Sequence, residues 1–248
     1  MNNFLASEFT TSFILRGNKV NLSLTSDTEL SVEQCSGCSV ASPFSTRSKA
    51  ETIFIENIIS IRTNNSKSDL GTLTNSAHRI LVEILVIDFV TKNKDHRWKR
   101  KSLCFRHTDP YIVSKWKEKL ENLLQSVSVD RPKKLLIFVN PFGGKGKGPI
   151  IFHKKVAPLL KLSRIMYDVI ETEYANHAKN LLQECSLDGI DGVISIGGDG
   201  IFSEIFTGML LRAAKEFNGD FSQLRNGNIR VGVIPAGKLS FFSCINKY

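Results

Sequence analysis

The sequence predicts two successive domains of different classes: a β-rich domain over residues 1–130 and an α/β domain over residues 131–248. In the first part, short segments rich in Ile, Val and Phe alternate with polar turns and end in one amphipathic helical pattern. In the second part, continuous apolar runs alternate with helical patterns, which is typical of strands buried on both faces of a parallel sheet. Between them, "SVSVDRP" contains Pro132 and is the expected linker, because helices seldom reach the residue before a proline.

The strands expected in the first part share a high content of β-branched and aromatic residues: "TSFILRG", "NKVNLSL", "ETIFIENIISIRT", "RILVEILVIDFVT" and "HRWKRKSLCFRH". The first two are expected to form a hairpin that turns at Gly17-Asn18, since this pair suits a tight turn. A helix follows in "DPYIVSKWKEKLENLLQSV", where Asp109 can cap and Pro110 can open the first turn. Apolar residues recur on one face of this helix: Ile112, Trp116, Leu120, Leu123 and Leu124.

The second part is expected to alternate strands and helices along the chain. The expected strands are "KKLLIFVN", "RIMYDVIET", "GVISIG" and "IRVGVIPAG". The expected helices are "IIFHKKVAPLLKL", "YANHAKNLLQEC" and "IFSEIFTGMLLRAAKEF". Pro158 should end or kink the first of these helices, because proline lacks the N–H that the helix needs.

Glycine-bearing turns follow three of these strands, at Asn140–Gly148, Gly197–Gly200 and Pro235–Gly237. Parallel strands place all three turns at the same edge of the sheet, where open α/β sheets bind ligands. Such turns suit phosphate oxygens, and Lys145 adds a cationic group. The phosphate-binding pattern GxxxxGK[ST] and the dinucleotide pattern GxGxxG are both absent. Each turn taken alone could also be a tight connection from a strand to a helix.

Asp199 is the only carboxylate within the Gly197–Gly200 turn. In phosphoryl transfer, such a carboxylate can position Mg²⁺ or accept a proton from the attacking hydroxyl. Asp199 could also serve only as the N-cap of the following helix, and the two roles are compatible.

Four motifs, in this order and spacing, resemble the catalytic domain shared by diacylglycerol, sphingosine and ceramide kinases, and among these the ceramide kinases most. The motifs are "LLIFVNPFGGKGKG", "ETEYANHA", "SIGGDGIFSEIFTGML" and "VGVIPAG". Over about residues 8–128, the strands followed by one helix with Trp116 resemble a pleckstrin-homology domain.

The resemblance implies transfer of the ATP γ-phosphate to the primary hydroxyl of ceramide, with sphingosine or diacylglycerol as alternative acceptors. It implies ATP and Mg²⁺ as cofactors and allows a response to Ca²⁺. Asp199 would be the catalytic residue. The residues implied in nucleotide binding are Asn140, Pro141, Phe142, Gly143, Gly144, Lys145, Thr172, Glu173, Tyr174, Ala175, Asn176, Glu204 and Gly237. Those implied to border the lipid hydroxyl are Gly197, Gly198, Asp199 and Gly200. Glu204 could equally be a solvated helix residue.

The charge distribution bears on partners, since the net charge is +9. Six basic residues lie between Lys92 and Lys101, around Trp98, and this segment could be either an anionic-lipid patch or a solvated hairpin. Nucleic acid is not expected, because no further aromatics accompany the cluster. The five cysteines are odd in number and scattered, which suits reduced thiols in a cytosolic setting. We therefore expect a cytoplasmic chain, and the basic segment suggests that it associates peripherally with a membrane.

The sequence departs from the family pattern after Gly237, where Lys238 and Leu239 replace small polar residues. The resemblance implies a second, mostly β lobe beyond this point, and only eleven residues follow Gly237. The chain is therefore expected to lack that lobe. Two hypotheses stay open: a lipid kinase, or a truncated and inactive form that only binds membrane, nucleotide or a partner. We expect little or no kinase activity, because catalysis needs a closed and oriented site.

Overall fold

The computed structural model describes residues 9–35, 50–67, 81–95, 97–216 and 229–236. The chain divides into two compact units, a first unit Met1–Asp130 and a second unit Arg131–Tyr248. Across these described residues, no helix is both long and apolar enough to cross a membrane.

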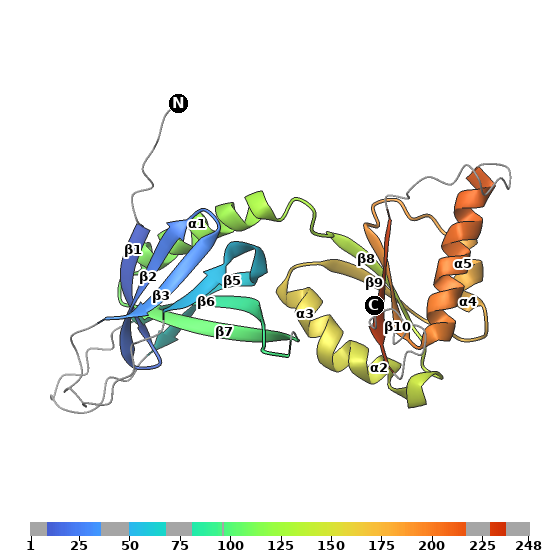
Figure 1. Ribbon diagram of the computed structural model, residues 1–248, viewed down its shortest axis with the longest axis horizontal. Helices are drawn as coiled ribbons and strands as arrows, with labels where there is room; N and C mark the ends of the chain where they lie inside the picture. The colour runs from blue at the N-terminus through green and yellow to red at the C-terminus, as the bar shows by residue number, and fades with distance from the viewer. Residues whose placement is uncertain (1–8, 36–49, 68–80, 96, 217–228, 237–248) are drawn as a thin grey trace. The chain divides into compact units, whose positions relative to one another are not determined.

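The first unit is an antiparallel sheet closed by one helix (Figure 1). Its described strands are β1 (Phe9–Leu15), β2 (Asn18–Ser26), β3 (Glu29–Gln34), β4 (Glu51–Phe54), β5 (Ile58–Lys67), β6 (Leu81–Lys92) and β7 (Trp98–His107). They form the sheet order β4-β3-β2-β1-β7-β6-β5. The short helix η1 (Ile55–Asn57) joins β4 to β5, so one predicted strand is in fact two.

The predicted hairpin of β1 and β2 is confirmed, but its turn lies one residue earlier than expected. Leu15 pairs with Asn18, so Arg16 and Gly17 are the two turn residues. Both have positive φ, at 51° and 84°, as a two-residue turn between twisted strands requires. The sequence pattern did not predict β3, because this strand has only six residues and two of its members are glutamates.

Helix α1 (Pro110–Val127) covers the core of the first unit. Its start is as predicted: the Asp109 carboxylate accepts a hydrogen bond from the Tyr111 N–H at 2.9 Å, and Pro110 opens the helix. Trp116 is fully buried, with the Phe9 ring 4.6 Å away between centroids. The predicted apolar face is therefore the buried face, with Val113 as an added member.

The second unit is a four-stranded parallel sheet of order β11-β10-β8-β9 in its described part. The strands are β8 (Lys134–Val139), β9 (Met166–Glu171), β10 (Gly192–Gly197) and β11 (Arg230–Pro235). The longer helices are α3 (Ala157–Leu162), α4 (His177–Glu184) and α5 (Asp199–Glu216). The short helices η2 (Gly144–Gly146), α2 (Gly148–Ile151) and η3 (Phe152–Val156) precede α3. This confirms the predicted order of an antiparallel β part followed by a parallel α/β part.

Helices cover both faces of this sheet (Figure 1), and the side chains of β8 therefore alternate between two hydrophobic cores. Phe138 lies in the core under α4 and α5, and Val139 in the core under α2, η3 and α3. The helical segment before Pro158 contains a π-helical turn, η3, which accommodates the break that this proline predicts.

The connection after β8 leads to one face of the sheet, and the connection after β10 leads to the other. Strands β8 and β10 are nevertheless neighbours in the sheet. Their carboxyl ends thus form a topological switch point, the place where open α/β sheets bind ligands.

Candidate active site

The strand ends at the carboxyl edge of the second unit are held together by backbone hydrogen bonds. The Asn140 N–H donates to the Ile196 carbonyl at 3.0 Å, which extends the β8–β10 pairing into the turn. The Thr172 N–H donates to the Val139 carbonyl, and the Ala236 N–H to the Gly197 carbonyl, both at 2.9 Å. The first residues after β8, β9, β10 and β11 therefore lie at one edge. The expected third turn continues into Gly237, which lies outside the described residues.

Asn140 holds the turn after β8 through its side chain. Its Oδ1 accepts hydrogen bonds from the N–H groups of Phe142 and Gly143, at 2.8 and 2.9 Å. These two N–H groups are thus engaged within the turn, and Pro141, which precedes them, has no N–H to offer. Asn140 therefore acts first as a turn-forming residue in this structure.

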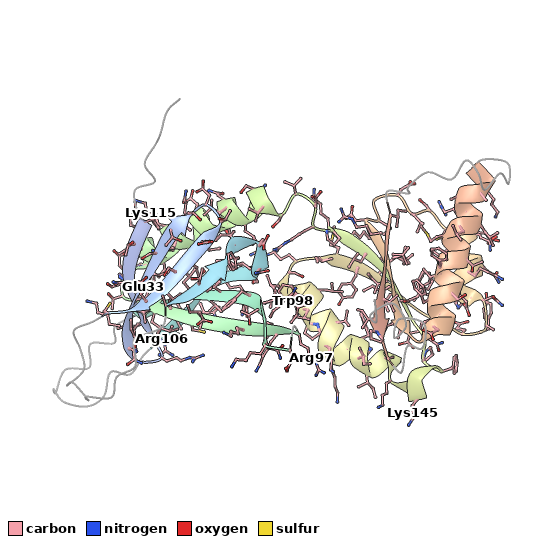
Figure 2. All side chains as sticks on the ribbon, viewed as in Figure 1. Glu33, Arg97, Trp98, Arg106, Lys115 and Lys145 are labelled. Atoms are coloured by element: carbon pink, nitrogen blue, oxygen red, sulfur yellow. The ribbon has the colours of Figure 1, made fainter. Side chains whose placement is uncertain are left out.

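The turn continues through the left-handed region at Lys145 and Gly146, with φ of 63° and 67°. Lys145 is exposed, and Figure 2 shows its side chain projecting from the turn. Lys147 is exposed as well. These two ammonium groups give the turn a cationic character suited to phosphate. Phe142 is 73% exposed, so the core does not require this aromatic ring.

The glycines at this edge fall into two groups. A Cβ at Gly148 would lie 2.4 Å from the Asn140 carbonyl oxygen, and one at Gly197 would lie 2.5 Å from Ile201 Cγ2. These two are required by packing within the chain. At Gly198 and Gly200, a Cβ would meet nothing within 4 Å. Packing therefore leaves open space on both sides of Asp199.

Asp199 is the first residue of α5 and is half-buried. A carboxylate at a helix N-terminus is stabilised by the helix dipole. One of its oxygens, Oδ1, is shielded from solvent. The structure therefore places this acid at the switch point, between two glycines with free space.

Glu204 lies five residues further along α5, about 140° around the helix from Asp199. Its side chain is half-buried, and Oε2 is shielded from solvent with no hydrogen-bond partner among the described residues. A buried carboxylate oxygen without a hydrogen-bond donor costs folding free energy, and such an oxygen often binds a water molecule or a ligand. The shielded Oε2 atom argues against the alternative that Glu204 is simply a solvated helix residue.

The turn between β9 and α4 contains the predicted nucleotide residues Thr172 to Asn176. Thr172 is buried at 4% exposure, whereas Tyr174 is 56% exposed. Asn176 takes the left-handed conformation, with φ 66°. The structure adds one residue that the sequence prediction missed: the Nδ1 atom of His177 accepts a hydrogen bond from the Glu173 N–H at 3.1 Å. The "NHA" pattern contained this histidine, but only the folded turn shows its contact.

The metal-binding capacity of this edge rests on few ligands. In the part of the chain that the structure describes, no group of three or more His, Cys, Asp or Glu side chains could hold a metal ion. Mg²⁺ is commonly held by one or two carboxylates together with substrate phosphates, so it does not need such a group. Asp199, with open space at both neighbouring glycines, fits that arrangement.

A second candidate surface is the basic hairpin of the first unit, residues 92–101 at the β6–β7 turn. The Lys92 ammonium lies 5.0 Å from the centre of the Trp98 ring, which is 58% exposed. Lys101 forms an ion pair with Glu51 at 2.6 Å and so does not present a free charge. Figure 2 shows Arg97 and Trp98 at the end of the hairpin. A pocket of about 360 Å³ lies beside it, lined by Phe54, Phe89, Lys92 and Trp98 among others.

The second unit is thus an open parallel α/β sheet with glycine-bearing turns at its carboxyl edge, and comparison with known proteins shows what it resembles. Residues 134–245 match the family of the diacylglycerol kinase catalytic domain. Human ceramide kinase is 40% identical over 152 residues, covering 60% of this chain and 28% of that protein. Ceramide kinase 1 of Caenorhabditis elegans is 35% identical over 161 residues, with 62% and 29% covered.

Sphingosine kinase 2 of Arabidopsis thaliana is 38% identical over 123 residues, covering 49% of this chain and 23% of that protein. The chain thus spans less than a third of the length of each of these relatives. The matches confirm the resemblance read from the motifs: residues 134–245 are similar to the diacylglycerol kinase catalytic domain, and more than half of the chain is similar to ceramide kinases.

Proposed function

We propose that the protein is a lipid kinase that transfers the γ-phosphate of ATP to the primary hydroxyl of ceramide, giving ceramide 1-phosphate. The observation that carries this proposal is the position of Asp199 at the switch point, between two glycines whose neighbourhood is open. The sequence identity of 40% and 35% to two ceramide kinases favours ceramide as the acceptor. The similarity to a sphingosine kinase and to the diacylglycerol kinase family keeps sphingosine and diacylglycerol as alternatives.

In this proposal the Asp199 carboxylate accepts the proton of the lipid hydroxyl. The hydroxyl oxygen forms a bond to the γ-phosphorus while the bond between this phosphorus and the β–γ bridging oxygen breaks, and ADP leaves. A carboxylate in this position contributes by orienting the hydroxyl as well as by taking its proton. Gly197, Gly198 and Gly200 would border both the phosphate and the hydroxyl.

The nucleotide would lie along the turns after β8 and β9. Asn140 through Lys145 and Thr172 through Asn176 are the proposed contacts, and Glu204 is proposed as a further one. The exposed Lys145 supports phosphate binding, because its ammonium offsets phosphate charge. Glu204 is supported by its shielded Oε2 atom. Gly237 is proposed from the family pattern alone.

In the alternative role of Asp199, its carboxylate would hold Mg²⁺ together with the nucleotide phosphates, and the bound ion would neutralise charge on the transferred group. A response to Ca²⁺ stays a prediction of the family resemblance.

We also propose that residues 1–130 form a pleckstrin-homology-like domain and residues 131–248 the N-terminal lobe of the kinase domain. The antiparallel sheet with α1 at its end supports the first assignment. The basic hairpin with its exposed Trp98 supports peripheral association with an anionic membrane surface. Since ATP is the proposed donor, the cytoplasmic face of that membrane is the proposed location.

Transfer of radioactive phosphate from ATP to ceramide, sphingosine and diacylglycerol in mixed micelles tests the kinase proposal. We expect weak labelling of ceramide, in keeping with the low activity expected from the sequence, and we expect Asp199→Asn to abolish it. Asp188→Asn is the matched control, because it removes an exposed carboxylate beside the opposite edge of the sheet. The proposal fails if Asp199→Asn labels lipid as fast as the unaltered chain. ATP binding without any transfer would instead favour the inactive, nucleotide-binding form.

A further inference from the structure

The turn between β9 and α4 is held by His177, which no motif assignment above gives a role. The ring Nδ1 atom of His177 accepts a hydrogen bond from the Glu173 N–H at 3.1 Å. The backbone N–H of His177 donates to the Tyr174 carbonyl at 3.2 Å. The Asn176 side chain makes no capping hydrogen bond to α4. His177 therefore closes the turn from both its ring and its backbone.

The His177 ring also fixes the direction of Tyr174. The two rings are stacked, with centroids 4.6 Å apart and planes inclined by 12°. Tyr174 is 56% exposed although one face of its ring lies on His177, so the side chain presents a large surface away from that contact. An open aromatic face held rigidly from behind is a surface on which a flat base can stack.

The hydrogen bond defines the form of the imidazole. A nitrogen that accepts from an N–H carries no proton itself, so this hydrogen bond leaves Nε2 as the ring nitrogen that carries the hydrogen. The start of the turn is fixed independently, because the Thr172 N–H donates to the Val139 carbonyl at the end of β8. The stacked pair is thereby tied to the strand edge that carries the candidate site.

We propose that His177 is a positioning residue for the nucleotide: it locks the Thr172–Asn176 turn and presents the outer face of Tyr174 to the purine base. This inference rests on the proposed nucleotide site and adds to it a route for base recognition. His177 does not touch the reacting atoms, so its loss should weaken binding of the base and leave binding of the phosphates unchanged.

Two variants separate the two contacts. His177→Asn keeps an acceptor close to the position of Nδ1 and removes the ring, whereas His177→Phe keeps a flat ring and removes the acceptor. His177→Ala removes both. His153→Ala is the matched control, since His153 is an exposed histidine of the same unit whose ring contacts Phe152.

Calorimetric titration of the full chain with Mg²⁺-ATP and with Mg²⁺-tripolyphosphate tests the proposal. We expect His177→Ala to weaken ATP binding about tenfold, the usual effect of one lost hydrogen bond with its contact. His177→Asn and His177→Phe should each show part of this loss, and His153→Ala none. Tripolyphosphate binding should stay within about twofold in all variants, which excludes general unfolding.

Equal losses for ATP and tripolyphosphate would overturn the inference, because His177 would then act on the whole site. Unchanged ATP binding in His177→Ala would overturn it as well. If the unaltered chain binds neither ligand, the proposed nucleotide site itself fails, and the inference falls with it. The outcomes are therefore distinguishable.

Discussion

Gly148 and Gly200 both lie at the candidate active site, but they differ in what an added methyl group would meet. At Gly148 it would lie 2.4 Å from a backbone oxygen, and at Gly200 it would meet nothing within 4 Å. Gly148→Ala should therefore lower the free energy of unfolding by about 1–3 kcal/mol, the usual cost of overpacking. Gly200→Ala should raise it by about 0.5–1 kcal/mol, because alanine favours the helix.

Urea unfolding followed by circular dichroism measures both effects. If the space at Gly200 serves a ligand, Gly200→Ala should also weaken ATP binding although it stabilises the fold. A variant that is more stable and binds ATP as well as the unaltered chain would contradict this reading of the glycine.

Asn140 offers a second prediction at the residue scale. Asn140→Ala leaves the N–H groups of Phe142 and Gly143 without their acceptor, and unfolding should become easier by about 1–3 kcal/mol. Asn140→Asp keeps an acceptor oxygen and adds a negative charge beside the proposed phosphates. We expect near-normal stability for Asn140→Asp but clearly weaker ATP binding in calorimetry. Equal ATP affinity for Asn140→Asp and the unaltered chain would place the phosphates elsewhere.

At the scale of elements, Asp191 joins the amino ends of three strands. Its Oδ2 accepts from the N–H groups of Lys133 and Lys134, at 2.6 and 2.9 Å, before β8 and at its start. The Asp191 N–H donates to the Lys134 carbonyl, and the Arg230 N–H donates to the Asp191 carbonyl. The hydrogen bonds from Lys134 and Lys133 lower the pKa of the Asp191 carboxyl below its ordinary value.

This lowered pKa predicts a pH dependence of stability. Because the folded-state pKa lies below the unfolded value, the stabilisation is present above the ordinary aspartate range. It is lost as the pH falls through the folded-state pKa. We expect Asp191→Asn to be less stable than the unaltered chain at pH 7, with the difference shrinking towards pH 3. Urea unfolding at both pH values measures this, with Asp188→Asn as control. A difference that is equal at both values would assign the effect to packing.

The elements that the sequence predicted best are those whose signals are local. The Asp109-Pro110 start of α1 and the apolar run of β8 depend on neighbouring residues, and both are confirmed. The hydrogen bond from Glu173 to His177 and the stacking on Tyr174 depend on the closed turn, which no periodicity encodes. The same holds for the packing role of Gly148, since the Asn140 oxygen approaches it only after the turn has folded.

At the scale of the whole molecule, the two units divide the proposed tasks. The proposed phosphate chemistry lies in the second unit, and the exposed basic hairpin in the first. Each unit has its own hydrophobic core, which favours independent effects of substitutions in the two units. Membrane binding and nucleotide binding should therefore be separable by mutation.

Replacing Lys94, Lys99 and Arg100 with Ala tests this separation. Lys101 is left in place, because its ion pair with Glu51 would otherwise be broken. Each basic residue near an anionic surface contributes about 1 kcal/mol, so the triple variant should bind phosphatidylserine vesicles roughly 100-fold more weakly. Sedimentation with vesicles measures this, and ATP binding by calorimetry should not change. The matched control is Lys115, Lys117 and Lys119 to Ala on α1, which removes the same charge from another surface. If both triple variants lose the same affinity, net charge and not the hairpin determines membrane binding.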